Sequence, residues 1–346
     1  MGFNDQILSE KLEAIRAERG IAGMAVAVTN SKGLLFKQAF GVDSMDRPDV
    51  PAGADSLYRI ASVTKMFTGT LIMQLREQGK LNIDDPVKKY LPWLKLRKQE
   101  ATETLTVRHL LTHTGGFWGD GAWTSKEGTR DESGMENTLK TILPWVELKA
   151  MPAEQVHIYS NIGYALLGQI AAAVTGGLYS QAVQDYILSP LGMTRSTFDF
   201  FIAATYPYSQ PHVRDEQGSL STLHDLRRGS LYTASGGLYS NAEDLCKMAR
   251  MFLRRGLTDS GERILGEQSL ADMQYRHIPR DNGDYYGFAT VAHPFGDRDI
   301  FGHGGSNLPY KTGLYIDYKT DLGVVVLMNT EAADLRSAIP EMIFDM

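Results

Sequence analysis

The chain has 346 residues, of which 43% are hydrophobic and 22% are charged, and its formal net charge is −6 at pH 7. This size and balance predict a globular protein of one large or two closely joined domains. Because the balance is acidic and no basic stripe is present, nucleic acid is excluded as an expected partner.

A helix and then two strands are expected at the N-terminal end. Residues 5–19 are amphipathic and charged, without the apolar core of a signal peptide, so we expect a cytoplasmic protein. AGMAVAVT (22–29) and GLLFKQAF (33–40) are strand patterns, and NSKG between them is a turn.

Helical patterns dominate the middle of the chain, from about residue 62 to 255. MFTGTLIMQLREQG (66–79) is apolar on most faces, which predicts a helix buried inside the protein and ending at Gly79. In DDPVKKYLP, Asp85 is expected to cap a short helix whose first residue is Pro86.

Strand patterns return near the C-terminal end in YYGFATVA, DIFGHGG, TGLYID and LGVVVLMN, and residues 331–344 are helical again. The longest apolar runs are strand-sized, so we expect no membrane-spanning helix and no membrane partner. The pattern predicts an α+β fold in which both chain ends, residues 1–61 and about 257–346, form one antiparallel sheet with flanking helices. A mainly helical region, about 62–256, is inserted in it, and the active site is expected in the cleft between the two parts.

Ser62 and Lys65, in RIASVTKMFTG, are the first candidates for chemistry. Their i, i+3 spacing places both side chains on one helix face, with Cβ atoms about 5–6 Å apart. A buried, neutral lysine can take the proton of a serine nucleophile, and a helix N-terminus offers backbone N–H groups to an oxyanion. The alternative is a serine N-cap beside a solvated lysine. The catalytic interpretation is favoured because this only Ser-x-x-Lys in the chain opens its most apolar helix.

A tyrosine near the serine could pass protons to a leaving group, and Tyr-Ser-Asn occurs twice. The copy at Tyr239 precedes a helical pattern with acids in its first turn and arginines in its last, so helix capping explains it. The copy at Tyr159 also precedes a helical pattern, and each asparagine could be the N-cap. The local sequence does not separate the two copies.

Two triplets near the C-terminal end, HGG (303–305) and KTG (311–313), could each line such a site, and the stretch itself does not decide between them. His109 and His113 have a metal-compatible i, i+4 spacing but lack the glutamate of a zinc-protease motif, so we expect packing roles and no metal. Cys246, the single cysteine, lies at helical spacing among apolar residues, which predicts core packing.

These motifs, in this order, resemble those of the serine β-lactamase and penicillin-binding superfamily: Ser-x-x-Lys, Tyr-x-Asn, and a Lys-Thr-Gly or His-x-Gly triplet. The flanking segments LYRIASVTKMFTG, LTVRHLLTHTGGF and YSNIGYALLGQIAAAVTG match as well. The resemblance runs from about residue 20 to 330. It is strongest to the class C β-lactamase branch with its esterases, D-aminopeptidases and D,D-peptidases, and it implies a β-lactamase/transpeptidase-like fold.

The resemblance also implies residue roles. Ser62 would be the acylated nucleophile, Lys65 its proton acceptor and Tyr159 the partner base or acid. Asn161 would position Lys65 and the substrate carbonyl. The third motif would fall on HGG (303–305), with KTG inside the following strand.

Around the third motif, His303 would belong to the catalytic group. Gly305 would let the strand approach a substrate closely, and the Ser306 N–H would complete the oxyanion hole with that of the nucleophile. Pro309 and Tyr310 stand where the family usually has Gly-Phe, beside the acyl pocket, so both are expected to contact substrate. A histidine in place of lysine is largely neutral near pH 7, which counts against β-lactamase activity.

The glycine-rich stretch between the first two motifs contains Trp118 and Trp123. It predicts either a lid over the site, with Trp118 touching substrate, or an exposed loop with two packed tryptophans.

We therefore predict a serine hydrolase that cleaves small ester or amide bonds, including those of D-amino-acid peptides, through a covalent acyl-enzyme. No metal or organic cofactor is needed, and the expected partner is a small-molecule or short peptide substrate. The alternatives are an acyltransferase using the same serine, a β-lactamase or D,D-carboxypeptidase, and an inert binding protein on the same fold. The oligomeric state stays open.

Overall fold

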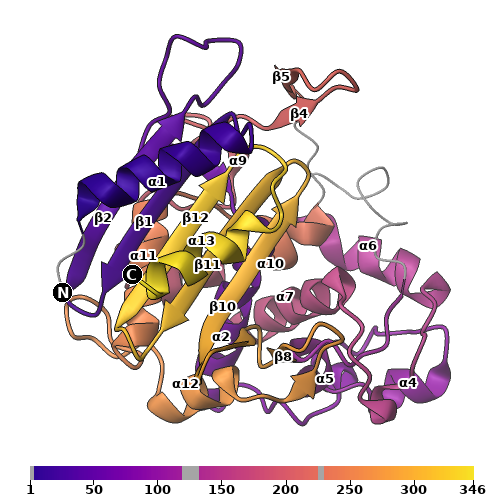
Figure 1. Cartoon of the computed structure of the whole chain (residues 1–346). Coiled ribbons are helices and arrows are strands. Elements are labelled where there is room, and N and C mark those ends of the chain that lie inside the picture. The colour runs from indigo at the N-terminus through magenta and orange to yellow at the C-terminus, as the bar shows by residue number, and fades with distance from the viewer. Residues whose placement is uncertain (1–3, 119–131, 225–229) are drawn as a thin grey trace.

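A computed structural model of the chain describes residues 4–118, 132–224 and 230–346 (Figure 1). Most of the glycine-rich stretch predicted as a lid, including Trp123, lies outside the described residues.

One eight-stranded antiparallel sheet forms the centre of the fold, with the strand order β2-β1-β12-β11-β10-β9-β8-β7. Strand β1 pairs with β12, with Met24 opposite Met328, so the two ends of the chain meet inside the sheet. This arrangement confirms the predicted α+β fold with a sheet from both chain ends. The strands of the sheet are β1 (Gly23–Asn30), β2 (Gly33–Gly41), β7 (Ile278–Pro279), β8 (Tyr285–Tyr286), β9 (Val291–Phe295), β10 (Arg298–Asn307), β11 (Tyr310–Asp317) and β12 (Leu322–Met328).

Two pairs of short strands lie outside this sheet, and helices make up most of the remaining regular structure. The short strands are β3 (Tyr58–Arg59) with β6 (Tyr239–Ser240), and β4 (His212–Arg214) with β5 (Leu220–Thr222). The α-helices are α1 (Asp5–Glu18), α2 (Thr64–Glu77), α3 (Val87–Tyr90), α4 (Gln99–Thr104), α5 (Val107–Leu111), α6 (Met135–Ile142), α7 (Asn161–Thr175), α8 (Tyr179–Val183), α9 (Phe200–Ala203), α10 (Thr233–Gly236), α11 (Ala242–Leu253), α12 (Glu267–Gln274) and α13 (Leu335–Phe344).

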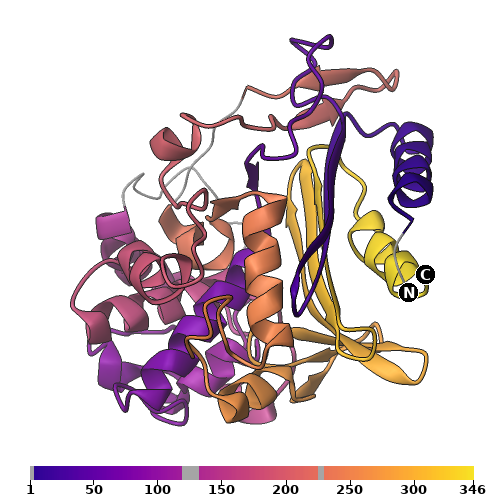
Figure 2. The same ribbon diagram turned by 90° about the vertical axis from the view of Figure 1, so that its left-hand side faces the viewer.

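Helices cover both faces of the sheet, as the edge-on view in Figure 2 shows. Helices α1 and α13 pack on one face and α11 packs on the other. Side chains of a strand alternate between the two faces, so Val324 and Val326 of β12 join the core under α1 and α13. Val325 and Leu327 join the larger core that includes α11. This double burial explains the unbroken apolar run of β12.

Helix α2 runs through the middle of the helical part and is buried from Thr64 to Leu75. It contacts α7, α10 and the sheet-flanking α12, which explains why its sequence is apolar on most faces. Among the described helices, none alone has the length and apolar character of a membrane span. The pair Asn161–Thr175 and Tyr179–Leu188, bent by 77° at its break, has them by length and composition only.

Several local predictions can be compared with the fold. The buried helix ends before Gly79, whose φ of +69° gives the left-handed turn expected there. Asp85 does not cap α3, because its carboxylate accepts hydrogen bonds from Lys89 Nζ and Tyr90 OH instead, and Pro86 is the N-cap. The single strand predicted for YYGFATVA is split into β8 and β9. Cys246 is fully buried in α11, where burial raises the pKa of its thiol to about 12.

Helix α11 falls in the chain region predicted to be the helical insertion, yet it packs directly on β1 and β12. The division of the chain into a sheet domain and a helical region stays a prediction.

Candidate active site

Ser62 lies in a short 3₁₀ turn, Ala61–Val63, that leads directly into α2. The residue before it, Ala61, has a φ of +50°, a backbone conformation that costs a non-glycine residue about 1–3 kcal/mol. The N-cap of α2 is Val63, without a side-chain cap, so Ser62 is not a capping serine. Its hydroxyl is partly exposed and faces a cleft.

Lys65 is fully buried one turn further along α2, which excludes the alternative of a solvated lysine. Its Nζ donates hydrogen bonds to Asn161 Oδ1 at 2.7 Å and to the Ser235 carbonyl at 2.8 Å, and it lies 3.3 Å from Ser62 Oγ. The Nζ also lies over the Tyr159 ring, 4.7 Å from its centroid. The structure thus brings together the serine, lysine, tyrosine and asparagine predicted to share a site.

The two Tyr-Ser-Asn copies have different surroundings. At the start of α7, Ser160 is the N-cap and accepts from the Gly163 N–H, so Asn161 is left to bind Lys65. This corrects the expectation that the asparagine caps. In the second copy Asn241 does cap α11, and Tyr239 is buried in an aromatic cluster, as predicted for a purely architectural copy.

Strand β10 lies against the turn that carries Ser62, and Gly305 makes this contact possible. A Cβ on Gly305 would lie 2.1 Å from Thr312 Oγ1 and 2.4 Å from the Ile60 carbonyl oxygen. Thr312, opposite Gly305 on β11, donates its hydroxyl to that same carbonyl at 2.7 Å. The space beside Gly305 is therefore taken by protein, and the close approach of this strand to a substrate stays a prediction.

The KTG triplet (311–313) lies inside β11, as predicted. Its side chains contact β10 and the segment before Ser62. Besides the contact from Thr312, the buried Lys311 donates from Nζ to Ser306 Oγ at 2.7 Å and forms an ion pair with Glu331 at 2.5 Å. Lys311 is therefore engaged with the strand that carries HGG, and its ammonium is directed at Ser306 and Glu331.

A cleft of about 410 Å³ opens over Ser62. Of the predicted residues, those that line it are Ser62, Tyr159, Asn161, His303 and Ser306.

The other candidates for substrate contact lie outside this lining. Tyr310 is buried, and its hydroxyl donates to Tyr208 OH at 2.8 Å and to the Ser209 carbonyl at 2.7 Å, so its side chain belongs to the core. Pro309 is buried as well. Trp118 is 52% exposed, and Lys149 Nζ lies over its ring, 5.1 Å from the ring centroid. None of these three residues is part of the cleft lining, and their contact with substrate stays a prediction.

His303 lines the cleft but is almost completely buried. Burial, helped by the nearby charge of Lys65, lowers the pKa of His303 to about 3, so the ring is neutral at pH 7. Its Nε2 lies 3.0 Å from Tyr286 OH and its Nδ1 lies 2.7 Å from the Gly304 carbonyl oxygen. Both ring nitrogens therefore already have a hydrogen-bond partner inside the protein.

The far wall of the cleft contains charged residues that the sequence motifs did not indicate. Arg280 and His293 both bind Asp284, at 3.1 and 2.5 Å, and Arg336 from α13 lies across Gly304. The hydrogen bond to Asp284 raises the pKa of His293. Arg280, Asp284 and His293 are close along the chain, whereas Arg336 reaches the cleft only because α13 packs on the sheet.

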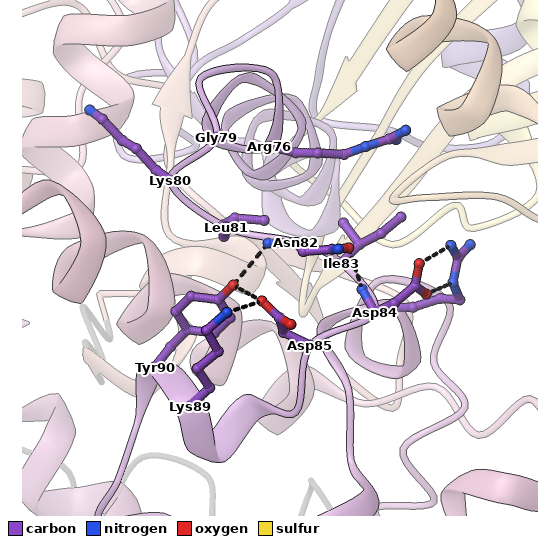
Figure 3. A pocket seen from close by; sticks show the side chains of 11 residues that line it. Arg76, Gly79, Lys80, Leu81, Asn82, Ile83, Asp84, Asp85, Lys89 and Tyr90 are labelled. Atoms are coloured by element: carbon purple, nitrogen blue, oxygen red, sulfur yellow. Dashed lines mark hydrogen bonds and ion pairs between the residues drawn. The ribbon is translucent and has the colours of Figure 1, made fainter.

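A second cavity, of about 530 Å³, lies beyond the end of α2 (Figure 3). In Figure 3, Lys89 and Tyr90 both point at Asp85. Asp84 forms an ion pair with Arg108 at 2.6 Å. The described residues that line this cavity include no serine, cysteine or histidine. This cavity therefore offers no counterpart to the group formed by Ser62, Lys65 and Tyr159.

The two histidines with metal-compatible spacing have separate tasks. His109 Nδ1 accepts from the Thr106 N–H in a capping box at the start of α5, and His113 is buried beneath the cleft. Within the residues that the structure describes, no group of three or more His, Cys, Asp or Glu side chains could hold a metal ion.

The sheet with its helices and the Ser-x-x-Lys turn define the class as β-lactamase/transpeptidase-like. The family model described as Beta-lactamase matches residues 8–343, and the chain belongs to this family.

Curated relatives agree with this assignment. Protein flp of Staphylococcus aureus (strain MW2) is 27% identical over 310 residues, 89% of this chain, and the chain spans only 60% of its length. Penicillin-binding protein 4 of Amycolatopsis lactamdurans is 30% identical over 284 residues, which cover 79% of this chain and 70% of the relative.

Solved structures have the same fold. The octameric penicillin-binding protein homologue from Pyrococcus abyssi superposes with a TM-score of 0.81 at 28% identity, covering 95% of this chain and 74% of the homologue. A class C beta lactamase from Rhodobacter sphaeroides gives a TM-score of 0.77 at 23% identity, covering 97% and 98% of the two chains. The second likeness concerns the fold alone.

Proposed function

We propose that this protein is a serine hydrolase that cleaves small ester or amide bonds, including those of peptides with D-residues, through an acyl-enzyme on Ser62. The observation that carries the proposal is the contact between Ser62 Oγ and the fully buried Nζ of Lys65, 3.3 Å apart. A serine hydroxyl becomes a good nucleophile only when a base lies within reach of its proton.

In this mechanism Ser62 Oγ attacks the substrate carbonyl carbon while its proton passes to the Lys65–Tyr159 pair. Lys65 must be neutral at that moment, and removal from water favours the neutral form of a lysine. The oxyanion would rest between the backbone N–H groups of Ser62 and Ser306. The leaving group takes a proton from the same pair, and water then attacks the ester carbonyl to release the acid and free Ser62.

His303 would take no proton in this cycle. The low pKa of its ring and the two inward hydrogen bonds support a positioning role in the wall of the cleft. Asn161, which accepts a hydrogen bond from Lys65, would fix the position of Nζ and present its own amide N–H to the substrate.

The test is intact-protein mass spectrometry after brief exposure to activated p-nitrophenyl acyl esters, with p-nitrophenol release followed in parallel. The wild type should gain one acyl mass, mapped to the peptide that contains Ser62, and Ser62→Ala should gain none. Ser337→Ala is the matched control. Ser337 is another serine of the cleft, its hydroxyl is bonded to the Asp334 carbonyl at 3.4 Å, and its removal should leave the adduct intact. Equal labelling of wild type and Ser62→Ala would overturn the proposal. Capture of the acyl group by an added amine at the expense of water would identify an acyltransferase.

A further inference from the structure

A buried chain of hydrogen bonds joins the second sequence motif to the third beneath the cleft. The Ser160 N–H lies 3.0 Å from His113 Nδ1, and His113 Nε2 lies 3.1 Å from Tyr286 OH. Tyr286 OH lies 3.0 Å from His303 Nε2, and His303 Nδ1 lies 2.7 Å from the Gly304 carbonyl oxygen. The proposed reaction does not use His113 or Tyr286.

The two ends of the chain decide the direction of every hydrogen bond in it. A backbone N–H can only donate, so His113 Nδ1 accepts and the neutral ring carries its proton on Nε2. A carbonyl can only accept, so His303 Nδ1 donates and its Nε2 is without a proton. The Tyr286 hydroxyl then accepts from His113 and donates to His303, and this single arrangement satisfies all four contacts.

Burial keeps the chain in this state. His113, Tyr286 and His303 are each at least 95% buried. Burial lowers the pKa of both histidines and raises the pKa of Tyr286, so all three side chains are neutral near pH 7. The charged groups that act on them are Lys65, Arg280 and Arg336. The other ionisable neighbours are Tyr159, Tyr164, which lies 3.4 Å from Tyr286 OH, and His157, whose ring is 5.5 Å from that of Tyr286.

This chain of hydrogen bonds also contacts the residues that act in the proposed mechanism. The ring of Tyr159 packs on His113 with centroids 4.2 Å apart, and it lies 6.3 Å from the ring of His303. Ser160, the N-cap of α7, lies between Tyr159 and Asn161 in the sequence. Gly304 lies in β10, two residues before Ser306, whose N–H is proposed to bind the oxyanion. The hydroxyl of Tyr286 thus links these two walls, because both histidines bind to it.

Resting on the proposed function, we infer that Tyr286 is a positioning residue. Its hydroxyl sets the spacing between the Tyr159–Asn161 segment and the 303–306 segment of β10, and it holds His113 and His303 in opposite neutral tautomers. Tyr286 also lines the cleft, and its proposed role is exerted through the hydrogen bonds of its hydroxyl to His113 and His303.

The first test is ¹⁵N NMR of the histidine side chains in the wild-type protein at pH 7, with the two rings assigned by loss of their signals in His113→Asn and His303→Asn. We expect the Nε2–H tautomer for His113 and the Nδ1–H tautomer for His303. A charged ring, or the same tautomer in both, would overturn the inference. This measurement requires no turnover and no folded Tyr286 variant.

The second test compares Tyr286→Phe with Tyr318→Phe in the acyl-ester assay. Tyr318 is the matched control, since its hydroxyl also accepts one hydrogen bond, from Gln274 Nε2, and donates another, to the Phe252 carbonyl, away from the cleft. Tyr286→Phe should lower kcat by about 10- to 100-fold, the loss that accompanies sub-ångström to ångström misplacement, with KM within about twofold. Tyr318→Phe should lose comparable thermal stability and keep its kcat.

The possible failures can be told apart. Wild-type kcat in a folded Tyr286→Phe would overturn the positioning role, as would equal kcat losses in the two phenylalanine variants. Absence of any acyl adduct on wild-type Ser62 would instead overturn the proposed function, while the tautomers would still decide whether the hydrogen-bond chain exists.

Discussion

Replacing Gly305 with alanine tests how closely β10 must approach the nucleophile. The added Cβ would lie 2.4 Å from the Ile60 carbonyl oxygen, and 3.4 Å is the lower end of ordinary contact, so the turn must recede by about 1 Å. Thr312 Oγ1, at 2.1 Å, must move as well, and with it the hydrogen bond that holds Ile60. Overpacking of this kind costs about 1–3 kcal/mol of unfolding free energy. A 1 Å shift of the nucleophile costs about 100-fold in rate.

The assay is the kcat for p-nitrophenyl ester turnover, measured together with the urea dependence of unfolding. Gly33→Ala is the matched control, because it is also a strand glycine and no atom lies within 4 Å of its added Cβ. We expect the Gly305 variant to lose about 100-fold in kcat and the Gly33 variant to keep wild-type kcat and stability. Wild-type kcat in a folded Gly305→Ala would refute the argument that this contact fixes the position of Ser62.

Two further predictions concern the same region. Thr312→Val removes the hydroxyl bonded to the Ile60 carbonyl, so it should lower the free energy of unfolding by about 1–3 kcal/mol and should also lower kcat. Thr312→Ser keeps the hydroxyl and should retain both the stability and the kcat of the wild type. Equal kcat in the two variants would contradict this prediction. The pKa of His303 is about 3 in the folded protein and about 6.5 when unfolded, so the unfolded state binds more protons as the pH falls and stability should decline from about pH 6.5 towards pH 3. Denaturant unfolding across this range should show a shallower decline for His303→Gln than for the wild type, and parallel curves for the two proteins would count against the buried neutral histidine.

Much of the fold follows from patterns that local physics can interpret. The apolar run of β12 predicts a strand buried on both faces, and the all-round apolar character of α2 predicts its central position. The i, i+3 spacing of Ser62 and Lys65 predicts their proximity, because helical geometry alone relates them.

Sequence-based inference fails where strand register and long-range packing decide. Tyr310 stands near the third motif along the chain, yet its side chain packs into the core against Tyr208. The contact between Gly305 and Ile60 depends on how β10 meets the turn before α2, and nothing in either segment alone indicates it. The link from His113 to Tyr286 joins positions 173 residues apart, so only the assembled sheet brings them together.

The pairing of β1 with β12 also has a consequence for biosynthesis. Strand β1 emerges from the ribosome early, but the strand that covers its inner edge, with Met328 opposite Met24, is made roughly 300 residues later. At translation rates of about 5–20 residues per second, the apolar hairpin of β1 and β2 waits roughly 15–60 s for this neighbour. During that interval Val26 and Val28 lack both the strand and the α13 face that bury them in the finished protein. The nascent chain therefore presents an open, hydrophobic sheet edge, the kind of surface on which chaperones act and aggregation begins.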